Sequence, residues 1–206
     1  MVSLSLIDYG AGNLGSISNG LKKVGAEVTI TDDPTTILNQ DGIVMPGDGA
    51  FGAAMEQLSE HNLDGILDQI LVEQKPFLGI CLGLQLLFDE SEEMGLFRGL
   101  GIIHGRIVKF PPGEKVPQMG WNTIQIQQPD HYLLQEIPDN TYVYFVHSFH
   151  PVLSDPANAL ALTTYGQTTY ASMVWRDDVV ASQFHPEKSG KLGVKMLENF
   201  VEHCRR

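Results

Sequence analysis

A cysteine between two glycines is the residue of this chain best suited to covalent chemistry. Cys81 is flanked by Gly79 and Gly83. The apolar residues 77–80 predict a buried strand, and residues 82–88 predict a buried helix. Glycines two positions to either side permit a sharp strand-to-helix turn, because larger side chains would block the packing of strand against helix. Such a turn presents the thiol at the carboxyl end of the sheet, beside a helix N-terminus that favours the thiolate.

A buried structural cysteine is the alternative interpretation of Cys81, because free cysteines are among the most buried residues in proteins. The flanking glycines, with a strand before and a helix after, favour the nucleophile. The chain has one other cysteine, Cys204, near its C-terminal end. Two such cysteines do not form a disulfide framework, so we expect a reducing, cytoplasmic setting.

A cysteine nucleophile needs a nearby base, usually histidine, and a third group that orients the base. His185 follows a predicted strand, as expected of residues that assemble an α/β site. Glu187 lies two positions further, so Pro186 between them holds both side chains on one side of an extended segment. Glu187 can then accept a hydrogen bond from the ring nitrogen that does not face Cys81. The alternative is that residues 184–187 form an exposed turn in which the acid has no role. The predicted turn at Cys81 favours the first interpretation, in which His185 is the base and Glu187 orients it.

The other six histidines fit less specific roles. Those that follow strand-like stretches suit either a structural or a site-lining position: His104, His147 and His150. Two lie in polar surroundings and are expected at the surface: His61 and His131. His203 belongs to the last predicted helix.

The elements that position these residues alternate between strand and helix in the first half of the chain. Strands are predicted at 2–8, 27–31, 42–45 and 77–80. Helices are predicted at 14–24, from 34 onward, and at 53–59 and 63–73. This alternation implies right-handed crossovers and a parallel sheet with helices on both faces.

Strands dominate the second half. Residues 89–93 predict an acidic loop, and Asp177-Asp178 predicts a tight turn. Strands follow at 102–110, 123–127, 141–146, 160–165, 170–175 and 179–183, and a helix at 192–202. No repeat or linker interrupts the pattern. We therefore expect residues 1–206 to form one α/β domain, an open and mostly parallel central sheet with an added mixed β-sheet.

Composition excludes several classes of protein. Hydrophobic residues make up 43% and charged residues 18% of the 206, as in globular proteins. No apolar run approaches the roughly 20 residues of a membrane span. Residues 1–8 lack the basic region and cleavage site of a signal peptide. The net charge of −12 argues against nucleic acid or an anionic membrane as a partner.

A glycine-rich turn after the first strand offers a different interpretation. Gly10, Gly12 and Gly15 match G-x-G-x-x-G, and Asp32 and Asp33 lie near the offset of a ribose-binding acid. The pattern alone does not exclude a dinucleotide site. A lone match is weak, however, and the thiol chemistry downstream disfavours it.

Three motifs, in order along the chain, resemble the class I, triad-type glutamine amidotransferases: residues 45–49, residues 79–85 and Phe184-His185-Pro186-Glu187. The resemblance implies a flavodoxin-like fold and no cofactor or metal. Further segments resemble one branch of that family, the glutaminase subunits of imidazole glycerol phosphate synthase. They are residues 7–13, 49–51, 120–122, 144–148 and 185–189.

The resemblance implies that Cys81 attacks the side-chain amide of L-glutamine, that His185 transfers protons and that Glu187 orients His185. The thioester and its hydrolysis each pass through an oxyanion. The family implies that the N–H of Leu82 and the turn carrying Asp48 and Gly49 stabilise it.

Substrate and partner contacts are also implied by the resemblance. Gln85 would bind glutamine, Glu93 would hold its α-ammonium, and the α-carboxylate end would lie against His147, Ser148 and Phe149. The implied partner is a (βα)₈-barrel cyclase subunit that uses the ammonia to make imidazole glycerol phosphate and aminoimidazole carboxamide ribotide in histidine biosynthesis. As a heterodimer, the two would meet at a face lined by Tyr9, Gly10, Asn13, Trp121, Asn122 and Lys188.

Asp48 departs from the family pattern, in which this position is usually apolar or glycine. A carboxylate facing the pocket would oppose an oxyanion, so we expect it to point outward. Two alternatives remain at this point. One is a glutaminase subunit of another class I enzyme, such as pyridoxal phosphate synthase or anthranilate synthase. The other is a non-catalytic domain of the same fold that keeps Cys81 as a redox sensor.

Overall fold

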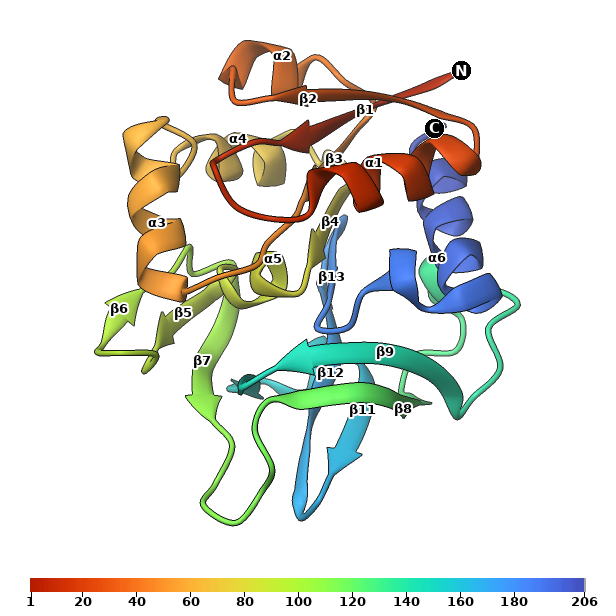
Figure 1. The fold of residues 1–206 in the computed structure, drawn as a ribbon. Helices are drawn as coiled ribbons and strands as arrows, with labels where there is room; N and C mark the ends of the chain where they lie inside the picture. The colour runs from red at the N-terminus through yellow and green to blue at the C-terminus, as the bar shows by residue number, and fades with distance from the viewer. Residues whose placement is uncertain (206) are drawn as a thin grey trace.

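The computed structural model describes residues 1–205, and within them nine strands form one large sheet (Figure 1). Its order is β2-β1-β3-β4-β13-β12-β11-β8-β9. The first five strands run parallel: β2 (Ala26–Thr31), β1 (Val2–Ile7), β3 (Gly42–Met45), β4 (Phe77–Ile80) and β13 (Val179–Ser182). The other four continue the sheet antiparallel: β12 (Thr168–Arg176), β11 (Ala159–Tyr165), β8 (Gln118–Ile126) and β9 (Thr141–His147). The predicted alternating parallel half is confirmed.

The central strands are short apolar runs, as expected of strands covered on both faces. Every residue of β3, β4 and β13 is buried. Strand β4 lies between β3 and β13, with Phe77 opposite both Ile43 and Val179. The C-terminal strand therefore reaches the centre of the sheet, beside the strand that precedes Cys81.

Helices cover both faces of the parallel half (Figure 1). Side chains alternate along a strand, so the two faces bury different residues. On one side Val44 packs in a core cluster with α1 (Leu14–Lys23) and α6 (Gly190–His203). On the other, Ile43 and Met45 share a cluster with three further helices: α2 (Pro34–Leu38), α3 (Phe51–Glu60) and α4 (Ile66–Val72). No helix within residues 1–205 is long and apolar enough to cross a membrane.

A smaller mixed sheet has the order β10-β7-β5-β6. Its strands are β10 (Phe149–Leu153), β7 (Ile103–Lys109), β5 (Phe88–Ser91) and β6 (Phe97–Arg98). The added mixed sheet is thus present, but the predicted strands from 123 to 175 extend the large sheet instead. Three short 3₁₀ helices complete the described elements: η1 (Tyr132–Leu134), η2 (Pro156–Asn158) and η3 (Pro186–Lys188).

The predicted helix over residues 82–88 was too long, and the acidic loop at 89–93 was partly wrong. Helix α5 spans only Leu82–Gln85, and strand β5 begins at Phe88. The backbone explains the early end, because the carbonyls of Leu86 and Leu87 accept hydrogen bonds from the N–H groups of Leu100 and Ile102, each at 2.9 Å. These bonds join the chain to the segment that leads into β7.

Candidate active site

Cys81 occupies the turn between β4 and α5 in a backbone conformation that non-glycine residues rarely adopt. Its φ is 56° and its ψ is −108°. Such a conformation persists only where the surrounding structure holds it, and it is found mainly at functional sites. The side chain is 7% exposed. The predicted sharp turn at Cys81 is therefore present.

The two flanking glycines are required by close approaches of the backbone. A Cβ on Gly79 would lie 2.8 Å from the carbonyl oxygen of Gly83. A Cβ on Gly83 would clash with the carbonyl oxygen of Met45 at the end of β3. Side chains at either position would push α5 away from the strands and displace the thiol.

His185 and Glu187 form a buried pair beside Cys81. Nδ1 of His185 lies 2.9 Å from Oε1 of Glu187, and their side chains are 7% and 1% exposed. His185 follows β13, whose residues pair with β4, and Glu187 lies in η3. Because Nδ1 is engaged by Glu187, Nε2 is the nitrogen that remains for Cys81. The structure brings together the three residues that the sequence singled out.

Electrostatics favours an imidazolium in this pair. Burial by itself lowers the pKa of His185, but hydrogen bonds to Cys81 and Glu187, with the charges of both, raise it to about 9. A protonated His185 beside the sulfur stabilises a thiolate. The arrangement can therefore supply a nucleophile and a proton donor at neutral pH.

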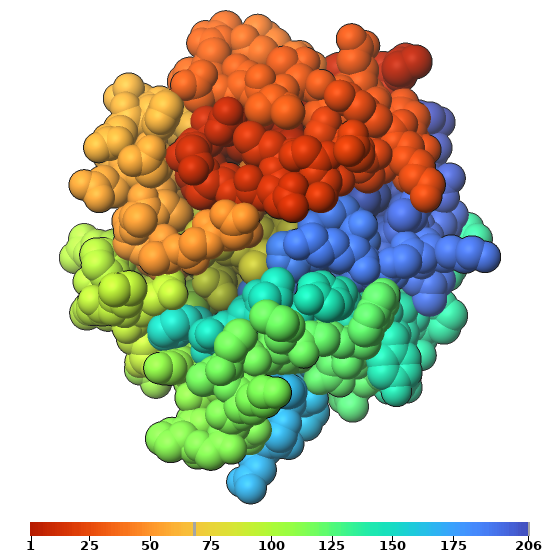
Figure 2. Space-filling model, viewed as in Figure 1, coloured from red at the N-terminus to blue at the C-terminus, as the bar shows by residue number. Residues whose placement is uncertain are grey.

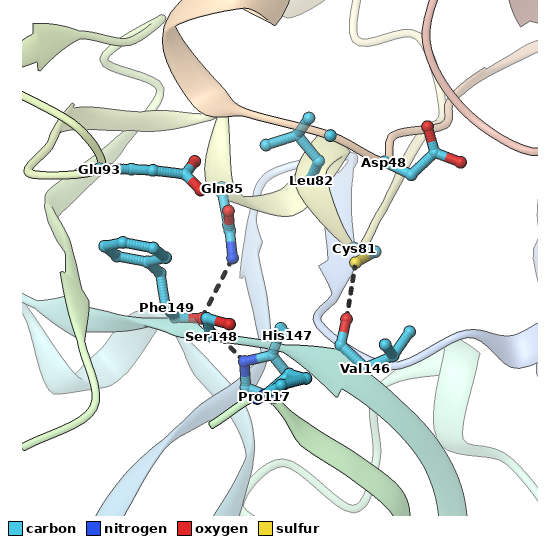
Figure 3. A pocket seen from close by; sticks show the side chains of 11 residues that line it. Asp48, Cys81, Leu82, Gln85, Glu93, Pro117, Val146, His147, Ser148 and Phe149 are labelled. Carbon is cyan, nitrogen blue, oxygen red and sulfur yellow. Dashed lines mark hydrogen bonds between the residues drawn. The ribbon is translucent and has the colours of Figure 1, made fainter. Parts of the chain in front are cut away.

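A cavity of about 220 Å³ opens in front of the thiol. It is lined by Asp48, Gly49, Cys81, Leu82, Gln85, Glu93, Pro117, Val146, His147, Ser148 and Phe149 (Figure 3). Every residue predicted for the oxyanion and for substrate binding is among them. Leu82 is the first residue of α5, so its N–H has no partner within the helix. The volume suits a small molecule.

The two halves of the large sheet meet at this cavity. In the space-filling view, yellow residues near position 80 are seen between the orange segment near 50 and the cyan segment near 145 (Figure 2). The loop after β3 supplies Gly49, the end of β9 supplies Val146 and His147, and α5 supplies Gln85. Ligand sites of open α/β sheets lie at such carboxyl ends of parallel strands.

The Asp48 carboxylate points away from Cys81 (Figure 3). Its Oδ1 accepts a hydrogen bond of 2.9 Å from the N–H of Gly12, in the turn after β1. The side chain is thus engaged outside the cavity, as expected from the sequence. The charge that would oppose an oxyanion is directed toward that turn.

Replacing Asp48 by valine is therefore expected to change glutamine turnover, the activity that the sequence resemblance implies, less than about threefold. The variant loses one exposed hydrogen bond, which contributes roughly 1 kcal/mol or less. Steady-state release of ammonia from glutamine by the isolated chain measures this. A gain of tenfold or more would show instead that Asp48 restrains the site.

Gln85 and Glu93 each have partners within the chain. Nε2 of Gln85 donates to the carbonyl of Phe149 and to Oε1 of Gln183, at 3.1 Å each. Oε2 of Glu93 accepts from the N–H of Phe51 at 2.7 Å, so Glu93 caps α3 while lining the cavity. Both side chains are held in place before any ligand enters.

The structure shows which of the two roles left open by the sequence, structural or site-lining, His147 has. Burial lowers its pKa to about 4, so the ring is neutral. Its Nδ1 donates to the carbonyl of Phe149 at 2.7 Å. His147 lines the cavity as a structural support for the Ser148-Phe149 backbone, and it adds no charge.

The remaining histidines lie elsewhere. His104 is exposed beside Asp89, and His150 is buried with Nδ1 3.2 Å from the carbonyl of Pro151. His131, which was expected at the surface, is half-buried, and its ring packs against Tyr132 and Trp175. Burial and the neighbouring His203 lower the pKa of His131 to about 4.

The sequence missed three residues around the thiol. The carbonyl of Val146 lies 3.9 Å from Sγ of Cys81, and Nε2 of Gln183 lies 3.8 Å from it. Pro117 lines the cavity. Gln183 carried one available signal, since it lies two residues before His185 where β13 ends. Val146 lies in the segment 144–148 but was given no role, and only the folded arrangement places Pro117 at the site.

The predicted docking residues divide into exposed and buried ones. Trp121 is 55% exposed, and Gly10, Asn13 and Lys188 are exposed as well. The inclusion of Tyr9 was wrong for its side chain, which is fully buried and donates a hydrogen bond of 2.7 Å to the carbonyl of Pro46. Asn122 is only half-buried, and Nδ2 donates to the carbonyl of Thr164 at 2.9 Å.

The glycine-rich turn offers little support for a dinucleotide site. A Cβ on Gly12 would lie 3.0 Å from Pro46, so this turn is packed on the next loop. Asp33 caps α2 through the N–H of Thr36, and Asp32 pairs with His61 at 3.0 Å. Both acids that could bind a ribose are thus engaged elsewhere.

Comparison with known proteins places this geometry in context. Residues 5–204 match the family model described as "Glutamine amidotransferase class-I". A relative named "Imidazole glycerol phosphate synthase subunit HisH", from Synechococcus sp. (strain JA-3-3Ab), is 48% identical over 100% of this chain and 95% of the relative. A relative of the same name from Methanosarcina barkeri (strain Fusaro / DSM 804) is 47% identical, covering 99% of this chain and 100% of its own length.

Solved structures share the fold at lower identity. The chain titled "Structure of PurLQS from Thermotoga maritima" has a TM-score of 0.78 at 17% identity, over 98% of this chain and 99% of that one. The chain titled "Crystal structure of glutamine amidotransferase" has a TM-score of 0.74 at 17% identity, also over 98% and 99%. At these identities the likeness concerns the fold alone.

Proposed function

Because the chain belongs to the glutamine amidotransferase class-I family, and within it to the HisH subunits of imidazole glycerol phosphate synthase, we propose that it hydrolyses L-glutamine to glutamate and ammonia. The observation that carries the proposal is the buried pair of His185 and Glu187, which lies beside Cys81 at the edge of a cavity. Residues 1–206 act as a single glutaminase domain.

In the first half of the reaction, the Cys81 thiolate attacks the side-chain amide carbon of glutamine. The carbon–nitrogen bond breaks, and the imidazolium of His185 gives its proton to the leaving nitrogen, which departs as ammonia. A γ-glutamyl thioester remains on Cys81. Glu187 keeps the imidazole oriented and stabilises its positive charge.

In the second half, water attacks the thioester carbonyl. The now neutral His185 takes a proton from this water, the carbon–sulfur bond breaks, and glutamate leaves. Both steps place negative charge on the former amide oxygen. The N–H of Leu82 and a donor from the turn at Asp48 and Gly49 stabilise it, and each such donor contributes about 3 kcal/mol.

The cavity also suits the other end of glutamine. Glu93 is an acid that lines it and is placed to hold the α-ammonium group. The backbone of residues 147–149 holds the α-carboxylate end, and Gln85 contributes its side-chain amide. These assignments account for the polar groups that converge on a cavity of this size.

The ammonia is consumed by a cyclase partner, a (βα)₈ barrel, in a cytoplasmic heterodimer. Free ammonia is lost to water, so a sealed contact between the two sites is needed. The exposed residues Gly10, Asn13, Trp121 and Lys188 form the docking face, with the half-buried Asn122 beside them. An exposed tryptophan is typical of the centre of such an interface.

Mixing the chain with different synthase partners tests this assignment. With the cyclase subunit of imidazole glycerol phosphate synthase and its ligand, glutamine is expected to replace added ammonia and give cyclised product. The glutaminase rate is expected to rise on mixing. Partners from pyridoxal phosphate synthase and anthranilate synthase serve as controls. Glutamine-dependent product with one of these, and none with the cyclase, would overturn the assignment.

A non-catalytic redox-sensing domain is the second candidate, since a cysteine beside an imidazolium also reacts with oxidants. The pairing of His185 with a buried Glu187 favours catalysis, because a sensor has no use for an oriented proton carrier. Release of ammonia from glutamine separates the two functions.

A further inference from the structure

A buried glutamine contacts both the thiol and a side chain that lines the cavity. Gln183 follows β13, and it is 0% exposed. Its backbone N–H donates to the carbonyl of Ser172 at 2.8 Å, which fixes the main chain from which the side chain extends. Burial of a primary carboxamide is costly unless its N–H and C=O groups are satisfied. The partners of Gln183 therefore indicate why the residue is there.

Each hydrogen bond around Gln183 has a fixed donor and a fixed acceptor. Its Nε2 lies 3.8 Å from Sγ of Cys81 and donates to it, while its Oε1 accepts from Nε2 of Gln85 at 3.1 Å. The second N–H of Gln85 donates to the carbonyl of Phe149 at 3.1 Å. A backbone carbonyl only accepts, so it fixes the orientation of the Gln85 amide. If the Gln183 amide were turned over, its oxygen would face the Cys81 sulfur and its N–H would face the N–H of Gln85, so both hydrogen bonds would be lost.

This arrangement of donors and acceptors leaves one polar atom of Gln85, its side-chain oxygen, for a ligand. Both N–H groups of Gln85 are used, and among the described residues its carbonyl oxygen accepts no hydrogen bond from another side chain. Gln85 lines the cavity. An acceptor in that position matches an N–H donor of the substrate, such as the amide or the ammonium group of glutamine.

We propose that Gln183 is a positioning residue that donates a hydrogen bond to the Cys81 sulfur and holds the Gln85 amide with its oxygen toward the substrate. This inference rests on the proposed glutaminase function and adds to it. One side chain then links the nucleophile to a group that recognises the substrate. A purely structural role would need neither the polarity of the amide nor its direction.

Two variants separate the two effects. Gln183→Glu keeps an oxygen that accepts from Gln85 but replaces the N–H at the sulfur with a second oxygen. It is expected to slow alkylation of Cys81 by iodoacetamide about tenfold at neutral pH, because the thiolate loses a donor. The KM for glutamine is expected to stay within about twofold, since Gln85 keeps its partner. The alkylation rates of Gln183→Glu and of the wild type are compared across a pH series, which reports the ionisation of the thiol.

Gln183→Leu removes both contacts. We expect the same slowing of alkylation and, in addition, a KM raised about tenfold, because the Gln85 amide is then held only by the carbonyl of Phe149. Asn199→Leu is the matched control, because Asn199 is a buried carboxamide on α6 that bonds the carbonyls of Leu133 and Gln135, and it lines no part of the cavity. It is expected to lose stability but to keep the alkylation profile and the KM.

The inference is overturned if folded Gln183→Leu and Gln183→Glu both alkylate with the wild-type pH profile and bind glutamine as the wild type does. If Gln183→Leu does not fold, the isosteric Gln183→Glu decides alone. Alkylation needs no turnover. A wild-type chain that releases no ammonia, either alone or with the cyclase subunit and its ligand, would refute the glutaminase proposal, while the alkylation series would still test the contact of Gln183 with Cys81.

Discussion

Replacing Cys81 by serine is expected to abolish ammonia release from glutamine, with a fall in turnover of about four orders of magnitude. Serine keeps the size and the backbone conformation of the turn. Its hydroxyl is far less acidic than a thiol, so the imidazolium of His185 no longer faces an anionic nucleophile. Glutamate and ammonia formation are measured under saturating glutamine, and mass spectrometry of acid-quenched protein checks for the γ-glutamyl thioester.

Cys204→Ser is the matched control. Cys204 is buried beside Gly42 at the opposite end of the sheet, and its pKa is raised to about 12 by burial and by the charges of Asp41 and Asp178. A thiol held neutral in this way is a poor nucleophile. We expect unchanged turnover. Full activity in Cys81→Ser, or its loss in Cys204→Ser alone, would show that the wrong cysteine has been assigned.

Replacing Glu187 by glutamine is expected to lower kcat about a thousandfold and to shift the alkaline limb of the pH profile to lower pH. Burial lowers the pKa of His185, whereas its bonds to Cys81 and Glu187 raise it to about 9. A raised pKa keeps the imidazole protonated up to about pH 9. In the wild type kcat/KM should therefore fall as the pH rises through about 9, when the proton for the leaving nitrogen is lost. Without the Glu187 charge, His185 loses that proton at a lower pH.

Profiles of kcat/KM from pH 6 to about pH 10 measure this difference. Glu202→Gln is the control, because Glu202 is exposed on α6 and pairs with Arg205, away from the site. It removes a carboxylate of the same type without touching the site. An alkaline limb at the same pH in Glu187→Gln and in the wild type would show that Glu187 does not set the ionisation of His185.

The parallel half of the fold and the three residues of the proposed triad follow from local sequence. Apolar runs such as residues 42–45 and 77–80 are long enough for a strand and too short for a helix. The glycines beside Cys81 report a backbone constraint that operates within a few residues. His185 and Glu187 are close neighbours in the chain, so their pairing needed no knowledge of the tertiary fold.

The errors arose where distant segments decide the structure. Residues 86–88 are apolar and suit a helix, but the N–H groups of residues 100–103 bind their carbonyls, and the chain continues as β5 from Phe88. Pairing between segments distant in sequence depends on context and leaves no local pattern. The contacts of Gln183 could not be predicted for the same reason, since a single glutamine in a sequence does not indicate which distant residues it will contact.

Tyr9 shows how far a turn motif predicts the positions of its side chains. The turn at residues 9–13 lies near the surface, but the ring of its first residue points inward to Pro46. Side chains of successive residues in a turn face different directions. A motif therefore locates a surface more reliably than it identifies which side chains reach it.

On the proposed mechanism, the position of β13 sets the point in its synthesis at which the chain can become active. β13 is the last strand of the chain, yet it pairs with β4 in the middle of the large sheet. While the ribosome is still making the antiparallel half, Cys81 is already present but its proton carrier is not. On the proposed mechanism, a chain that terminates before residue 185 lacks the base that Cys81 needs, so we expect it to consume no glutamine.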